Sequence, residues 1–191
     1  METIKTRPVI SAILQKKDSG GLKIFIQTRW KPHIDAPYSG MFEIPAGGIE
    51  PYEDVYDALK REVKEECGLD VVRIINDFKS TIEEPAIGDK AFTFKPFLCQ
   101  QVLSTRNGLP WIGFVFLCEV AGEVKMQETE AKDPTWVNLN ELEKMVTNEP
   151  EKIFPLQCRY KLNHLFICKI KTRELLIFKF NFSVFLNPIQ I

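Results

Sequence analysis

The chain has 191 residues, of which 45% are hydrophobic and 27% charged, which is typical of one soluble globular domain with a core of its own. The 25 Lys and Arg nearly balance the 26 Asp and Glu, and the net charge of −1 gives no global attraction to nucleic acid or to an anionic membrane. We therefore expect neither as a partner, and a phosphate-bearing ligand has to be held by a local site.

The five cysteines are scattered along the chain without a CxxC pair, so the sequence predicts neither a zinc site nor a disulfide framework. The first ten residues, METIKTRPVI, lack the apolar core of a signal peptide. No stretch approaches the roughly 18 uncharged apolar residues that a membrane helix needs. These features favour a reducing, cytoplasmic setting.

The predicted chain consists mostly of hairpin-connected strands with a few helices, and turn residues lie between them. Ser104–Gly108 contains the Asn-Gly pair of a tight hairpin turn, and residues 28–46 form a loop-rich stretch with three prolines. In chain order we expect strands at 9–14 and 22–27 around a polar turn at 16–21, a helix at 53–67, strands at 71–75, 91–103, 111–120 and 135–137, and helices at 139–146 and 159–170.

No linker divides the chain, so the pattern predicts a single mixed α/β domain over residues 1–170. Residues 171–191 form an apolar C-terminal tail of unknown role. The tail is short for a membrane helix and rich in β-forming residues, which leaves packing on the domain, an edge strand or a dimer contact open. A monomer and a homodimer are equally compatible with the sequence.

The helix expected at 53–67 carries charge on the side that should face the core. At about 100° per residue, Glu62 and Glu66 fall within the apolar stripe, and Glu65 lies on its flank. Four apolar side chains define that stripe: Val55, Ala58, Leu59 and Val63.

An acidic run on a helix is usually a solvated face, and that interpretation is one alternative here. Like charges inside an apolar stripe are costly without a cation, however, and carboxylate oxygens at this spacing are suited to Mg²⁺ or Mn²⁺. The pattern therefore favours a metal site whose cation bridges phosphate oxygens.

Residues 47–69, GGIEPYEDVYDALKREVKEECGL, resemble the signature of the MutT/Nudix hydrolases, the Nudix box. Gly47 is followed after five residues by Glu53, and seven residues later by the run REV-x-EE-x-GL that starts at Arg61 and ends at Leu69. Every specified position is met, which makes the match far more specific than a lone glycine motif. The resemblance implies an α/β/α sandwich with a mixed sheet. It also implies a metal-dependent hydrolase that cleaves a phosphoanhydride bond in a nucleoside diphosphate linked to another group.

The resemblance also implies roles for the box residues. The metal ligands would be Glu62, Glu65 and Glu66, with a backbone carbonyl at or next to Gly47. Arg61 would orient these carboxylates. Glu53 would support the same array. The general base would be either a glutamate of the box or a residue of a loop before a late strand, where Glu128 and Glu130 lie. A solvated loop charge is the alternative for the last two residues.

Substrate specificity lies outside the box, where the sequence is less informative. Arg29 could grip a phosphate or be an exposed charge at a strand end, and Phe42 is a candidate for contact with a base. A nucleoside triphosphate or similar small nucleotide is the leading substrate class, with ADP-ribose or a nucleotide sugar as the alternative. A nucleotide-sensing module without turnover is disfavoured because the box keeps all of its acidic residues.

Overall fold

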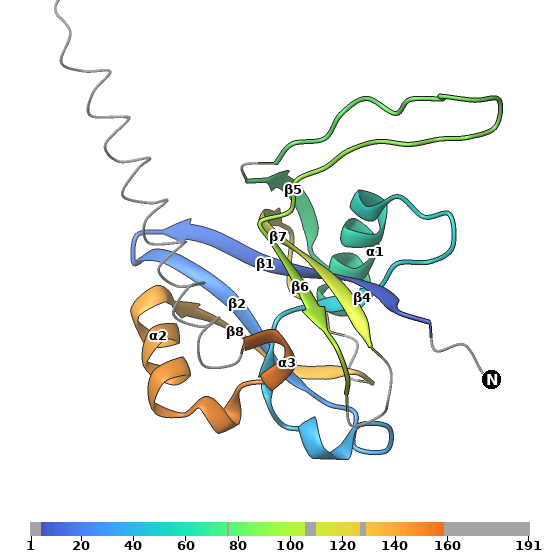
Figure 1. Ribbon diagram of the computed structural model, residues 1–191. Helices are drawn as coiled ribbons and strands as arrows, with labels where there is room; N and C mark the ends of the chain where they lie inside the picture. The colour runs from blue at the N-terminus through green and yellow to red at the C-terminus, as the bar shows by residue number, and fades with distance from the viewer. Residues whose placement is uncertain (1–4, 76, 106–109, 127–128, 159–191) are drawn as a thin grey trace, which may run out of the picture.

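The computed structural model describes residues 5–75, 77–105, 110–126 and 129–158. Within these ranges a mixed sheet of eight strands lies between helix α1, Val55–Cys67, and helix α2, Leu139–Asn148 (Figure 1). This layering confirms the α/β/α sandwich that the resemblance implied. The helix expected at 159–170 and the apolar tail from residue 171 lie outside the described residues.

The centre of the sheet is the parallel pair β1 and β7, and the other pairs are antiparallel. The order β3-β2-β1-β7-β5 runs across the sheet, while β4 pairs with β1, β6 with β7 and β8 with β2. The bounds are β1 Arg7–Asp18, β2 Gly21–Arg29, β3 Phe42–Glu43, β4 Ala46–Gly48, β5 Asp70–Ile74, β6 Leu98–Val102, β7 Trp111–Ala121 and β8 Ala131–Asn138.

Strand β1 changes partner along its length, and this change brings the start of the Nudix box into the sheet. Residues 15–18 of β1 pair with β2, whereas residues 9–11 pair with β4. The glycine-containing strand Ala46–Gly48 is thus hydrogen-bonded to the central strand and fixed in position beside α1.

Two sequence-based predictions about strands were wrong. Lys16 and Lys17 belong to β1, because the hairpin turn occupies only residues 19 and 20 and is closed by a 2.8 Å hydrogen bond from the Gly20 backbone N–H to Asp18 Oδ1. Residues 91–97 are not part of a continuous strand. They form isolated bridges with residues 79 and 83, which makes 77–97 a long arm between β5 and β6 (Figure 1).

Helix α1 has a defined cap at each end. The carboxylate of Asp54 accepts a 2.8 Å hydrogen bond from the Tyr56 N–H, so the helix begins at Val55 rather than at Glu53. Gly68 ends it in the left-handed conformation, with φ of 72°. The apolar stripe predicted from the sequence is confirmed as buried: Val55, Ala58, Leu59 and Val63.

The two faces of the sheet carry separate core clusters. The α1 face buries Phe25 and Phe116, and the opposite face buries Ile13 and Leu117 under α2. Among the described residues no helix is long and apolar enough to cross a bilayer. The first cluster packs α1 on the central strands of the sheet, to which β4 is also paired, and this packing positions the acidic side of the helix.

The base of the arm packs on α1 through aromatic contacts. The Tyr56 hydroxyl donates to Asp77 at 2.6 Å, and its ring lies 6.3 Å from those of Phe92 and Phe94. Phe92 and Phe94 therefore pack against the core.

Substituting Gly68 tests how tightly the end of α1 is fixed. A Cβ at this position would lie 3.0 and 3.1 Å from the backbone N and O of Lys125, in a conformation that L-residues avoid. We expect Gly68→Ala to lower the free energy of unfolding by about 3 kcal/mol in urea denaturation, since strain and steric overlap add. Gly88→Ala is the matched control, because Gly88 has φ of 85° with nothing within 4 Å, and should cost about 1 kcal/mol. Equal losses for the two variants would contradict the steric argument.

Candidate active site

The carboxyl group of Glu62 lies against the backbone of Gly47. A Cβ added to Gly47 would lie 1.9 Å from Cδ of Glu62, so no side chain can replace this hydrogen without moving the carboxylate. Burial is the main influence that raises the pKa of Glu62, while its ion pair with Arg61 opposes the rise. The absence of a side chain at residue 47 thus brings one box carboxylate directly onto strand β4.

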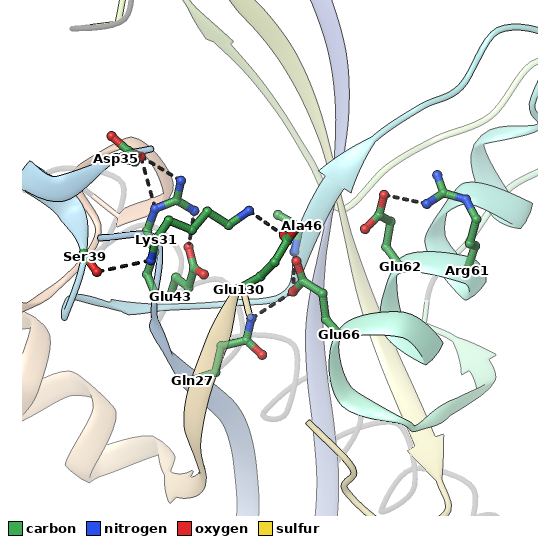
Figure 2. A network of polar contacts seen from close by, with 11 residues as sticks. Gln27, Lys31, Asp35, Ser39, Glu43, Ala46, Arg61, Glu62, Glu66 and Glu130 are labelled. Atoms are coloured by element: carbon green, nitrogen blue, oxygen red, sulfur yellow. Dashed lines mark hydrogen bonds and ion pairs between the residues drawn. The ribbon is translucent and has the colours of Figure 1, made fainter. Parts of the chain in front are cut away.

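Glu66 lies one helical turn further along and points at the same strand (Figure 2). Its Oε2 accepts hydrogen bonds from Gln27 Nε2 at 2.8 Å and from the Ala46 N–H at 3.4 Å. Burial raises the pKa of Glu66 to about 8, an effect that the negative charges of Glu43 and Glu62 reinforce and the Gln27 hydrogen bond opposes. Two half-buried carboxylates on one helix face therefore approach the Ala46–Gly48 strand.

Arg61 connects the remaining acids of the box. Its Nε donates to Glu53 at 2.7 Å, and its Nη1 donates to Glu62 at 2.7 Å and to Glu65 at 3.2 Å. Its Nη2 also donates to the Gly48 carbonyl at 2.9 Å. The Arg61 guanidinium lowers the pKa of Glu53 to about 2, so Glu53 is an ionised partner that fixes the arginine. This geometry has the form expected of an orienting arginine and a supporting glutamate.

Glu62 and Glu66 are suited to a hard divalent cation, and Glu65 is turned away from them. Among the described residues no three His, Cys, Asp or Glu side chains are gathered closely enough to hold a metal ion. The side chain of Glu65 is 53% exposed and paired with Arg61, against 13% for Glu62. Carboxylates and backbone carbonyls are the oxygen donors that Mg²⁺ and Mn²⁺ take, so the donor set at β4 fits such an ion.

Glu130 lies near Ala46 and Glu66, where it is paired with Lys31 (Figure 2). Its carboxylate pairs with Lys31 at 2.5 Å, and its backbone carbonyl accepts from the Trp30 N–H at 2.7 Å. Its charge also contributes to the raised pKa of Glu62, which places it within electrostatic reach of the box. Glu128, the other base candidate, lies outside the described residues.

Arg29 is engaged in ion pairs inside the fold. Its Nη2 lies 2.7 Å from Asp35 and its Nη1 3.1 Å from Glu43, and its guanidinium lies over the ring of Phe154 at 4.8 Å. The side chain is only 16% exposed. The alternative of an exposed strand-end charge is therefore wrong, because both acids are buried and need a cation beside them.

A cavity of about 270 Å³ opens next to β4 on the sheet face opposite α1. Arg29 contributes to its wall, but Phe42 is not among the described residues that line it and packs on the second core cluster instead. Sequence reasoning missed Arg7, which lines the cavity although it lies forty residues before the box. The lining of the cavity also includes Val9, Ser11, Lys31 and Trp111.

Comparisons with known proteins agree with this geometry. The NUDIX domain family model matches residues 5–157. An RNA pyrophosphohydrolase of Bartonella clarridgeiae is 25% identical over 131 residues, which are 64% of this chain and 70% of the relative.

Solved structures with the same fold include a MutT NUDIX hydrolase from Burkholderia pseudomallei, with a TM-score of 0.52 and 21% identity over 71% of this chain and 85% of that one. The NUDIX domain of Shewanella oneidensis NrtR, complexed with ADP ribose, has a TM-score of 0.59 and 14% identity over 88% of each chain. At these identities the structures bear on the fold alone, whereas the family model covers most of the chain. The chain belongs to the NUDIX domain family and is a Nudix hydrolase.

Proposed function

We propose that this Nudix hydrolase cleaves a phosphoanhydride bond in a nucleoside diphosphate-linked compound, with Mg²⁺ or Mn²⁺ as cofactor. The observation that carries the proposal is the approach of Glu62 and Glu66 to the Ala46–Gly48 strand, where a missing side chain makes room for Glu62. A cavity large enough for part of a nucleotide lies beside that strand.

The cation would be held by Glu62, Glu66 and a backbone carbonyl at Ala46 or Gly47. Glu65 would join the ligand set when Arg61 releases it, since these two side chains are paired at 3.2 Å. A bound divalent cation would supply Lewis-acid polarisation of the phosphoanhydride and lower the pKa of a water molecule. Within the protein, Arg61 keeps Glu62 oriented toward β4 while Glu53 fixes the arginine.

Strand β4 separates the two parts that the substrate would occupy. Gly47 is opposite Ile10, whose side chain packs under α1, whereas Gly48 and Ala46 are opposite Val9 and Ser11, which line the cavity. Alternate residues of a strand face opposite sides of a sheet. A substrate that crosses the edge of β4 would place its diphosphate at the carboxylates and the attached nucleoside in the cavity.

A small nucleotide, such as a nucleoside triphosphate, is the proposed substrate class. The cavity of about 270 Å³ lies just below the range for ligand pockets, roughly 300–1,000 Å³, and suits one nucleoside rather than two. ADP-ribose and nucleotide sugars are the alternative class, since the same bond type is cleaved in each. Arg29 contributes to the cavity wall, and its role in substrate binding would be to hold that wall, because three of its nitrogens are already bonded.

Substitution of Glu66 tests its proposed role as a metal ligand. With Mg²⁺ present, we expect wild-type protein to hydrolyse one class within a panel of nucleoside triphosphates, ADP-ribose and nucleotide sugars. Glu66→Gln should lower kcat by a factor of about 100 or more, because a neutral amide holds a divalent cation poorly. The unfolding free energy should be unchanged or higher, since the substitution removes a half-buried charge. Glu123→Gln, on an exposed loop, is the control, and full activity of Glu66→Gln would refute the metal assignment.

Substitution of Glu130 tests its proposed role as the general base. Glu130→Gln should reduce kcat by about 100-fold or more and leave the Mg²⁺ concentration dependence unchanged, because the side chain would accept a proton rather than bind the ion. Steady-state kinetics over a Mg²⁺ titration separate the two effects. A variant that keeps more than half of the wild-type kcat would show that Glu130 is only a solvated partner of Lys31.

A further inference from the structure

Three basic side chains line the cavity beside β4, and two of them are held in ion pairs with acidic side chains. Arg29 is held between two acids, and Lys31 is paired with Glu130. Arg7 is exposed and takes part in none of the ion pairs between described residues. Its guanidinium is therefore the cationic group of the cavity wall that no described acidic side chain neutralises.

Arg7 lies next to Trp111 at the start of the central parallel pair. The two residues are in direct register across β1 and β7, so their side chains emerge on the same face of the sheet. Both line the cavity. A guanidinium and an indole are thus neighbours at the end of the cavity where the two strands begin.

Two glycines make room for these side chains. A Cβ at Gly48 would lie 2.6 Å from Nη2 of Arg7, and a Cβ at Gly113 would lie 2.6 Å from Cζ3 of Trp111. The guanidinium therefore lies over β4, and the six-membered ring of the indole lies over the backbone of β7. In both cases the absence of a side chain on the glycine lets the functional group lie directly on the backbone, which sets the direction in which that group points.

We propose that Arg7 and Trp111 form a nucleobase subsite that selects guanine, an inference that rests on the proposed function for the position of the diphosphate. Trp111 would stack on the base. A guanidinium only donates hydrogen bonds, and guanine offers two adjacent acceptors, O6 and N7, to such a fork. Adenine presents N7 beside an N6 amino donor, which leaves one arginine N–H without an acceptor.

The side of β4 on which Arg7 lies favours a base contact over a phosphate contact. Gly47 faces the carboxylates under α1, and Gly48, which accommodates Arg7, faces the opposite side of the sheet. The phosphates belong to the carboxylate side in the proposed function. Arg7 lies instead beside the aromatic ring, where the far end of the nucleotide would be.

Calorimetric titration of the wild-type protein with GMP and with AMP tests the subsite. Neither ligand contains a phosphoanhydride, so binding is measured in EDTA without turnover. We expect GMP to bind at least tenfold more tightly than AMP. Arg7→Ala should weaken GMP binding about tenfold and change AMP binding less than twofold, and Trp111→Ala should weaken both about tenfold. Trp111→Phe should keep most of the affinity, because a phenyl ring still stacks.

Matched controls and a second type of variant keep the proposal falsifiable. Arg73→Ala and Phe78→Ala change exposed residues of the same types outside the cavity and should leave both affinities within twofold. Gly113→Ala keeps Trp111 but forces its indole to tilt, because the new methyl group would overlap the ring. This variant should bind both nucleotides more weakly, and circular dichroism should show an unchanged fold.

Three results would overturn the subsite. The wild type could bind GMP and AMP with equal affinity, or Arg7→Ala could weaken the binding of both ligands by the same factor. The third is that folded wild type binds neither ligand at a ligand concentration of about 10 mM. The proposed function is tested separately by hydrolysis. Guanine-selective binding without turnover of any nucleotide would remove the proposed function and keep the subsite. Hydrolysis of nucleotides without a preference for guanine would keep the proposed function and remove the subsite.

Discussion

The burial of two carboxylates against a glycine-containing strand is the constraint on which the rest of the site depends. Removing a charged group from water is costly unless it is paired or bound to a cation, and Glu62 and Glu66 both lie on the core-facing arc of α1. The surrounding groups reduce this cost only in part. Arg61 pairs with Glu62, whereas Glu66 is bonded to the neutral Gln27 and a backbone N–H. A divalent cation between these carboxylates and β4 would provide the missing positive charge.

Strand β4 serves both sides of the site because of how its neighbours are arranged. β1 pairs with β4 near its start and with β2 next to the hairpin, so two residues of the box, Gly47 and Gly48, lie in the sheet. One of them, Gly47, accommodates a carboxylate, and the next, Gly48, accommodates Arg7 on the opposite face. The same two-residue segment thus separates the bond to be cleaved from the group that is recognised.

Much of the box was predictable from the sequence, because it is local. The 3.6-residue period placed Val55, Leu59 and Val63 in the core, and the same wheel placed Glu62 and Glu66 within the buried arc. Asp54 and Gly68 delimit the helix through contacts within a few residues, and only the start of the helix was misplaced. Periodicity and capping are short-range, so one sequence contains them.

The cavity was not predictable, because it depends on contacts between distant segments. Arg7 reaches the site only because β1 and β7 pair in parallel, 104 positions apart in the register of Arg7 with Trp111. The sequence left Arg29 as either a phosphate-binding residue or an exposed charge, whereas the loop at 30–43 brings Asp35 and Glu43 to its guanidinium. The register of a parallel pair and the path of a loop are set by packing, which no local pattern records.

The central claim, that the Glu62–Glu66 face binds a divalent cation, is tested most directly by thermal unfolding in MgCl₂ or MnCl₂ without any nucleotide. A ligand that binds only the folded state stabilises it by about 2.7 kcal/mol at a concentration 100 times its Kd. The wild-type Tm should therefore rise by several degrees with metal concentration, and the Tm of Glu66→Gln should stay constant. An equal rise in both proteins, or no rise in the wild type, would contradict the account.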